Sequence, residues 1–428
     1  MTVLPLPSRA WFPLLQGEPA RRALGQARTI ADALRTRIST PAPLAHFSLG
    51  GGDAGIALFF AYLAEAFPGE GYEDTAVERL EQAIDGMGRF DSWPALYGGF
   101  SGVAWVTEHL QGWLLDPSEG DPCEGVTASL ESYLDRSPWR DDFDLIMGLV
   151  GLGVFALERR PRPAGDRCLE LAVTRLSEIC ERGPQGITWR TALEHLTPEV
   201  RTIYPEGHYN LGVAHGLPGV IALLGEAHAA GVAREHTRTL LSGAVDWLLA
   251  QERSPDAGSL YPSLIDPRGE EPKPSRLAWC YGDLGIAAAL LGAARYAGEP
   301  LWEQRALGIA RAAAARPAAN SKVIDFGLCH GAAGVAHLFN RLYQASGEPA
   351  FAEAARFWLE QALGMRRDGE GIAGFLAYVP DDHGEMGWRQ DPGFLTGVAG
   401  LGLALLAAAT PIEPAWDRVL LVAIPPVP

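Results

Sequence analysis

The chain has 428 residues, of which 47% are hydrophobic and 20% charged, and its formal net charge is −17. This composition is typical of a folded globular protein. The acidic balance argues against a nucleic-acid partner, because phosphate binding needs a clustered basic face. The apolar runs are shorter than the roughly 20 residues of a membrane span, so no transmembrane segment is expected.

The first 15 residues contain prolines and lack a basic start followed by a continuous apolar core, so no export signal is expected. A cytoplasmic location follows, and the five cysteines would stay reduced there. In that setting a cysteine more often binds a metal or takes part in catalysis than forms a disulfide.

A short motif recurs along the chain: a glycine, two further residues, a second glycine and then an aliphatic residue. Its seven copies begin at Gly52, Gly99, Gly148, Gly216, Gly282, Gly331 and Gly397, at intervals of 47 to 68 residues. The segment after each copy is apolar on nearly every face, as in residues 286–294, which predicts a buried helix. More amphipathic stretches lie between the copies, such as residues 75–84 and 349–363, and predict solvent-facing helices.

This alternation predicts an all-α fold, an α/α toroid with an inner ring of seven helices and an outer ring of seven, forming a single domain over residues 1–428. An open solenoid would need polar capping repeats at its ends. The terminal copies here are as apolar as the central ones, which favours a closed ring. Two less regular segments, residues 116–140 and 161–204, leave room for a small irregular insertion.

In a pseudo-symmetric ring, the residue immediately before each first glycine should face the same end of the toroid. In chain order these residues are Gly51, Gly98, Met147, His215, Tyr281, His330 and Thr396. One position earlier, Cys280 and Cys329 occupy the same place in adjacent repeats. Side chains capable of chemistry are therefore concentrated in one arc of the ring, which predicts a functional site there.

Cys280, Cys329 and His330 form a set of two thiolates and one imidazole, which suits Zn(II). Three protein ligands leave the fourth tetrahedral position open, as in a catalytic zinc site. The alternative is a pair of inert buried thiols, because free cysteine is commonly buried.

Three strings resemble the signature motifs of the lanthionine synthetase C-like family, the lantibiotic cyclases: residues 279–285 (WCYGDLG), 329–334 (CHGAAG) and 210–219 (NLGVAHGLPG). The resemblance runs over the whole chain, and the length is similar to that of the stand-alone class I cyclases. It implies a seven-fold double ring of α-helices with one zinc ion at its centre.

The resemblance also implies a reaction, in which cysteine thiols of a dehydrated precursor peptide add to dehydroalanine or dehydrobutyrine and close lanthionine or methyllanthionine rings. The family's zinc ligands match Cys280, Cys329 and His330. Its other functional positions match His215, Asp144, Arg276 and Tyr281. The implied partners are the precursor peptide, with its leader and core, a lanthipeptide dehydratase and a transporter.

The chemistry suggests a role for each of these side chains. His215 would be the general acid, because an imidazole has a suitable pKa for proton transfer near pH 7. Asp144 would orient this histidine, and Arg276 would hold the enolate oxygen or the peptide backbone. Each side chain also has a structural alternative, in which His215 only ends a helix, Asp144 only caps one and Arg276 only forms an ion pair. The role of Tyr281 stays open.

Two other classes of function are compatible with a helical toroid. A glycoside hydrolase needs a pair of catalytic carboxylates and a terpene cyclase needs an Asp-rich magnesium motif, and neither is aligned in the repeats. A non-catalytic zinc-containing scaffold that binds a peptide or glutathione stays open as an alternative.

Overall fold

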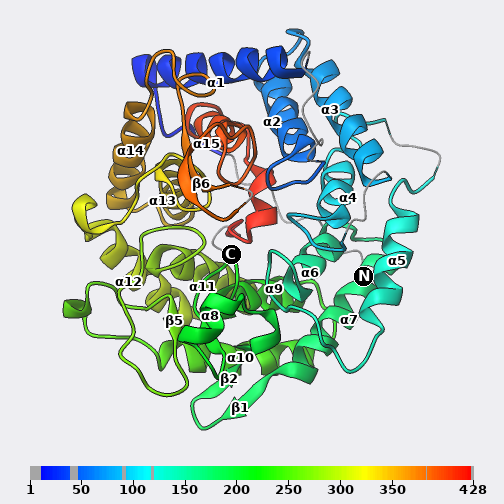
Figure 1. Ribbon diagram of the computed structural model, residues 1–428, viewed down its shortest axis with the longest axis vertical. Coiled ribbons are helices and arrows are strands. Elements are labelled where there is room, and N and C mark those ends of the chain that lie inside the picture. The colour runs from blue at the N-terminus through cyan, green and yellow to red at the C-terminus, as the bar shows by residue number, and fades with distance from the viewer. Residues whose placement is uncertain (1–10, 39–46, 89–92, 117–119, 382, 426–428) are drawn as a thin grey trace.

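The computed structural model describes residues 11–38, 47–88, 93–116, 120–381 and 383–425. Within these residues the chain forms two concentric rings of helices (Figure 1). The expectation of no export signal rests on the first 15 residues, and the first ten of these lie outside the described part of the chain. No described helix is both long and apolar enough to cross a bilayer.

Seven helices form the inner ring, and each begins directly after the first glycine of one motif. They are α2 (Asp53–Ala66), α4 (Phe100–His109), α6 (Leu149–Glu158), α9 (Leu217–Ala229), α11 (Asp283–Ala297), α13 (Ala332–Ser346) and α15 (Val398–Ala409). Each inner helix contacts the next, and α15 contacts α2, so the ring is closed. The inner helices are buried over most of their length, as their continuous apolar composition predicts.

The outer ring covers the inner one helix by helix. It consists of α1 (Gly17–Ile38), α3 (Tyr72–Met87), α5 (Glu124–Leu134), α7 (Pro163–Ile179), α10 (Arg234–Leu249), α12 (Pro300–Ala315) and α14 (Pro349–Gly364). Six of these pack on the inner helix that precedes them in the chain, whereas α1 packs on α15. The N-terminal helix thus completes the last repeat, and the predicted double ring of seven and seven helices is confirmed within the described residues.

The second glycine of each motif lets the inner helix approach the loop that precedes it. A Cβ atom added at Gly102 would lie 1.9 Å from the carbonyl oxygen of Leu96, and one added at Gly334 would lie 1.8 Å from that of Leu328. No side chain fits at such distances. The recurrence of the motif is therefore explained by packing of the helix start on its loop.

The three longest intervals between motifs contain short additional elements. Between α7 and α9 lie β1 (Glu181–Gly183), β2 (Gly186–Thr188), β3 (Arg190–Thr191), η1 (Leu193–His195), α8 (Pro198–Ile203) and β4 (His208–Asn210). The other two long intervals add η2 (Pro255–Ala257), β5 (Leu264–Ile265), β6 (Ala377–Pro380) and β7 (Met386–Arg389). A further short element, η3 (Ala318–Asn320), lies in the shorter interval between Gly282 and Gly331. The strands pair antiparallel as β1–β2, β3–β4–β5 and β6–β7. The elements β1 to α8 fall in the irregular segment 161–204, but the β6–β7 hairpin was not predicted.

After α15 the chain turns into the middle of the ring, where η4 (Ala415–Leu420) lies (Figure 1). Tyr97 Oη donates to the carbonyl of Val419 at 2.8 Å, and Trp279 Nε1 donates to that of Leu420 at 2.9 Å. The C-terminal segment is thus anchored by loops of the second and fifth repeats. It fills space that the inner helices leave between them.

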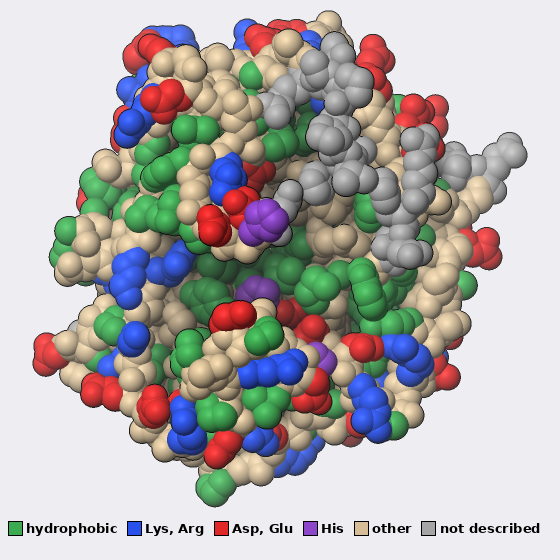
Figure 2. All heavy atoms as spheres, in the orientation of Figure 1, with side chains coloured by type: hydrophobic (Ala, Val, Ile, Leu, Met, Phe, Trp, Pro, Cys, Tyr) green, Lys and Arg blue, Asp and Glu red, His purple; other side chains and the backbone are tan. Residues whose placement is uncertain are grey.

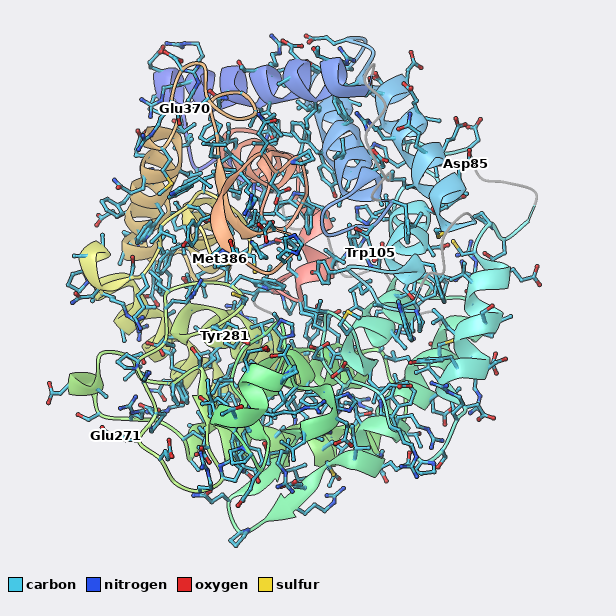
Figure 3. The ribbon with its side chains drawn as sticks, viewed as in Figure 1. Asp85, Trp105, Glu271, Tyr281, Glu370 and Met386 are labelled. Atoms are coloured by element: carbon cyan, nitrogen blue, oxygen red, sulfur yellow. The ribbon has the colours of Figure 1, made fainter. Side chains whose placement is uncertain are left out.

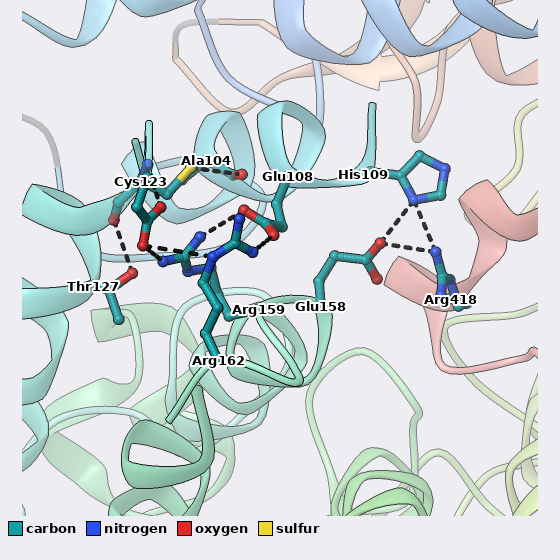
Figure 4. A network of polar contacts seen from close by, with 10 residues as sticks. Ala104, Glu108, His109, Cys123, Thr127, Glu158, Arg159, Arg162 and Arg418 are labelled. Atoms are coloured by element: carbon teal, nitrogen blue, oxygen red, sulfur yellow. Dashed lines mark hydrogen bonds and ion pairs between the residues drawn. The ribbon is translucent and has the colours of Figure 1, made fainter. Parts of the chain in front are cut away.

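Charged side chains extend this anchoring. Arg418 of the C-terminal segment pairs with Glu158 of α6 at 2.8 Å, and His109 Nδ1 lies 2.9 Å from the same carboxylate (Figure 4). Nearby, the buried Arg159 pairs with Glu108 at 2.6 Å and joins α6 to α4. These contacts lie away from the motif loops, and we assign them to the stability of the ring.

Candidate active site

The loops that precede the inner helices are tied together by backbone hydrogen bonds at one equivalent position. Ala214 N–H donates to the carbonyl of Cys280 at 3.5 Å, and Cys280 N–H donates to that of Cys329 at 3.2 Å. Cys329 N–H donates to Leu395 O at 2.8 Å, and Leu395 N–H donates to Gly50 O at 3.0 Å. This belt gives the repeats a common register. The two cysteines therefore occupy equivalent and adjacent places, as the repeat alignment predicts.

The predicted metal ligands come together at this end of the toroid. One donor atom each of Cys280, Cys329 and His330 lies within 4.8 Å of the others. Two sulfurs and one nitrogen so close together fit a soft, tetrahedral ion such as Zn(II) with one position left for a ligand. The face that contains these loops is hollowed near its middle, with hydrophobic side chains around the hollow (Figure 2).

Cys280 differs from the other described cysteines in its protonation. The hydrogen bond from Cys329 lowers the pKa of Cys280 to about 5, and the same contact raises the pKa of Cys329 well above its ordinary value. Burial instead raises the pKa of Cys123 to about 12 and that of Cys168 to about 11. The group formed by Cys280, Cys329 and His330 therefore favours a thiolate at Cys280. The thiols of Cys123 and Cys168 remain protonated and unreactive near neutral pH.

His215 and Asp144 form a hydrogen-bonded pair at the same end of the ring. His215 Nδ1 and Asp144 Oδ2 lie 2.6 Å apart, and the imidazole is half-buried. Burial lowers the pKa of His215, but the hydrogen bond and charge of Asp144 outweigh it and raise the pKa above its ordinary value. The negative charge of Cys280 acts on His215 in the same direction. The backbone hydrogen bond from Ala214 to Cys280 holds the loop of His215 against the loop of this cysteine. The structure thus brings Asp144 and His215 together as predicted.

Tyr281 and Arg276 border the same group. The ring of Tyr281 stacks near that of His215, with centroids 6.3 Å apart, and Tyr281 lies toward the middle of the toroid in Figure 3. Asn210 Nδ2 donates to Tyr281 Oη at 3.2 Å, and burial raises the pKa of this phenol to about 12. The charge of Arg276 lowers the pKa of Cys280, after the larger effects of Cys329 and His330. Tyr281 thus lies beside His215, and the charge of Arg276 acts on Cys280.

Two further groups at the site were not singled out from the sequence. Asp325 Oδ2 lies 3.6 Å from His330 Nε2, and its side chain is fully buried. His195, from η1, lies with its Nδ1 3.5 Å from Asp142, two residues before Asp144. For Asp325 the sequence does contain a signal, because it stands six residues before a first glycine, as Asp142 does in another repeat. His195 comes from the insertion, which has no counterpart in the other repeats.

Comparisons with known proteins agree with this geometry. A family model described as lanthionine synthetase C-like protein matches residues 44–421. The nisin biosynthesis protein NisC of Lactococcus lactis subsp. lactis is 24% identical over 365 residues, which cover 77% of this chain and 82% of NisC. A zebrafish (Danio rerio) protein named glutathione S-transferase LANCL1 is 22% identical over 342 residues, covering 77% and 80% of the two chains.

A solved structure described as nisin cyclase superposes with a TM-score of 0.76. The superposition covers 95% of this chain and 98% of that one, at 21% sequence identity. At this identity the similarity shows a shared fold, and it extends over nearly the whole toroid.

Proposed function

Because this chain belongs to the lanthionine synthetase C-like family, we propose that it is a lanthipeptide cyclase. It adds cysteine thiols of a dehydrated precursor peptide to dehydroalanine or dehydrobutyrine and so forms thioether rings. The observation that carries the proposal is the position of the Asp144–His215 pair beside a cluster of two cysteines and a histidine. The names of NisC and of the nisin cyclase structure support the same activity.

Cys280, Cys329 and His330 would hold one Zn(II), which in an open site lowers the pKa of a bound thiol and so supplies a thiolate near neutral pH. The rest of the reaction concerns the substrate and the acid. The peptide sulfur forms a bond to the β-carbon, and the electron pair of the carbon–carbon double bond moves toward the carbonyl. One proton leaves the thiol and one is delivered to the α-carbon, so the addition is balanced.

His215 is suited to deliver this second proton. Its Nδ1 is held by Asp144, so Nε2 is the atom left to transfer a proton to the α-carbon. The raised pKa keeps the imidazole protonated closer to neutral pH. Asp144 therefore both orients His215 and keeps it charged, in the way that carboxylates commonly act on imidazoles.

Tyr281 and Arg276 would act on the enolate oxygen. Tyr281 Oη accepts a hydrogen bond from Asn210, so its own proton remains available to a ligand. The guanidinium of Arg276 has donors in a fixed geometry and a charge that opposes the one developing on the enolate. The two groups together would stabilise the intermediate between sulfur addition and proton delivery.

A cavity of about 420 Å³ between the β6–β7 hairpin and the residues that follow α14 offers a place for part of the peptide. Ile324, Leu376, Arg367 and Trp388 are among its lining residues, and Ile324 directly precedes Asp325. Trp388 lies on the β6–β7 hairpin and is 55% exposed. An apolar side chain of the precursor would bind in this cavity.

Further expectations depend on this assignment. A cyclase of this kind would work in the cytoplasm as a single domain over residues 1–428. Its partners would be the leader and core of the precursor, the dehydratase that makes the dehydro residues, and the transporter that exports the product.

The test combines metal content with ring closure. Purified protein should contain about one zinc per chain, and Cys280→Ala and Cys329→Ala should lose it, whereas Cys123→Ala should retain it as a matched control. Dehydrated peptides with a free cysteine should lose their alkylatable thiol without a change in mass, because cyclisation is an internal addition. Zinc-loaded protein that leaves the thiols free across a panel of such peptides would contradict the cyclase assignment.

A second candidate is supported by the name of the zebrafish relative, a glutathione S-transferase. In that case the thiol of glutathione would occupy the position of the peptide thiol. Glutathione would be either a substrate of a transferase or the ligand of a non-catalytic scaffold. The same experiment with glutathione present separates the two functions. A transferase would increase the mass of the dehydrated peptide by one glutathione, a cyclase would leave the mass unchanged, and a non-catalytic scaffold would bind glutathione without either product.

A further inference from the structure

The residue six positions before the first glycine has a recurring structural role. In three repeats its side-chain oxygen accepts the backbone N–H two residues later. Asp325 accepts from Gly327 at 3.3 Å, Asn210 from Gly212 at 2.9 Å, and Asp391 from Gly393 at 2.7 Å. This oxygen shapes the loop in the same way in each of the three repeats.

The other side-chain oxygen of Asp325 and of Asp391, Oδ2, has a different partner. In the last repeat, Asp391 Oδ2 accepts a hydrogen bond from Thr396 Oγ1 at 2.5 Å, and Thr396 stands immediately before the first glycine. In the preceding repeat that place is taken by His330, and Asp325 Oδ2 lies 3.6 Å from His330 Nε2. Asp391 Oδ2 thus holds a threonine in the last repeat, whereas the equivalent oxygen of Asp325 faces a proposed metal ligand.

Asp325 is held firmly in this place. It is 1% exposed, and its Oδ2 also accepts the backbone N–H of Tyr378, in β6, at 3.3 Å. A Cβ atom added at Gly331 would lie 2.4 Å from Asp325 Oδ1, so the loop encloses the carboxylate closely. A buried carboxylate needs polar partners, and the imidazole of His330 faces Asp325 Oδ2 with its Nε2 at 3.6 Å.

We propose that Asp325 is the positioning residue for His330: it keeps the imidazole hydrogen on Nε2 and leaves the lone pair of Nδ1 for the metal ion. The proposal rests on the metal site proposed above. A neutral imidazole has one hydrogen, and a metal can bind only the nitrogen that lacks it. The carboxylate that faces the other nitrogen therefore selects the ligand atom and orients the ring.

Asp325→Asn tests this without changing the volume of the side chain. If the amide oxygen stays on Gly327, the NH₂ group faces two other donors, Tyr378 N–H and His330 Nε2–H. We expect a zinc dissociation constant roughly 10- to 100-fold higher than that of the wild type, measured by competition with a chromophoric chelator. In a His330→Ala background the same substitution should have no further effect on zinc affinity.

Asp391→Asn is the matched control in the neighbouring repeat. There the NH₂ group would face a threonine hydroxyl, which can accept a hydrogen bond as well as donate one. Zinc affinity should therefore stay at the wild-type value. The proposal is overturned if Asp325→Asn binds zinc within twofold of the wild type, or if Asp391→Asn weakens binding equally.

A measurement on the unaltered protein covers the case in which Asp325→Asn does not fold. Nitrogen-15 NMR of histidine-labelled, zinc-loaded wild type should show His330 protonated at Nε2 and metal-bound at Nδ1. A metal-bound Nε2 would overturn the proposal, as would a wild type that binds no zinc. Neither binding nor NMR requires ring closure, so a protein that binds zinc in this way but closes no ring would refute only the cyclase assignment.

Discussion

Asp144→Asn is the substitution from which we expect the clearest kinetic effect. It removes the charge that faces His215 at 2.6 Å and leaves a side chain of the same size. A hydrogen bond to a charged group contributes about 1.5–3 kcal/mol. The His215 side chain is 40% exposed, so water screens the interaction and the lower end of that range applies. About 1.4 kcal/mol corresponds to tenfold, so kcat should fall roughly tenfold.

The pH profile gives the more specific evidence. A general acid must be protonated, so the rate falls as the pH rises through its pKa. Asp144 raises the pKa of His215, and its loss should therefore move the basic limb of kcat to lower pH. The control is Asp141→Asn, in the same loop, because Asp141 pairs with the exposed Arg136. A basic limb that stays in place in Asp144→Asn would refute the assignment of His215 as the acid.

The remaining predictions concern the closed ring. Asp417→Asn should lower the free energy of unfolding in urea by roughly 3–5 kcal/mol, because it leaves the buried Arg341 without its carboxylate at 2.5 Å. Burial raises the pKa of Asp417, but Arg341 and His337 together outweigh this and lower it, so the stabilisation is present above the unfolded-state pKa and is lost as the pH falls through the folded-state pKa. This account would be contradicted if the difference in unfolding free energy between the wild type and Asp417→Asn stayed the same at low pH. Gly402→Ala should destabilise by about 1–3 kcal/mol, since its Cβ would lie 2.2 Å from Phe59 at the α15–α2 contact. Gly292→Ala, with no atom of another element within 4 Å, should leave the unfolding midpoint unchanged or raise it, and equal losses in both variants would show that packing is not the cause.

The inner ring and the grouping of Cys280, Cys329 and His330 could be predicted from local sequence. In a repeated fold, residues at the same place in each repeat lie at the same place in space. The Gly-x-x-Gly copies marked the start of every inner helix, and the residues just before them marked one end of the ring. Cys280 and Cys329 therefore appeared as neighbours although 49 residues separate them. The backbone belt that joins Cys280 to Cys329 is the physical basis of that inference.

Other contacts depend on segments that have no counterpart in the repeats. The packing of α1 on α15 joins the two ends of the chain, and no spacing in the sequence indicates it. The same is true of η4 inside the ring and of His195, which reaches Asp142 from an insertion. Such contacts depend on the shapes of the packed elements and on the hydrogen-bond partners that buried polar groups need. Both are defined only in the closed ring.

By itself, the sequence determined the helical repeats, the end of the ring at which the site lies and the three candidate ligands, because each depends on residue type at a repeated position. Only the tertiary structure decided which carboxylate serves which histidine. Asp144 contacts the histidine of the next repeat, whereas Asp325 faces the histidine of its own loop. The physical reason is that a hydrogen bond depends on distances of a few tenths of an ångström, which sequence register does not specify.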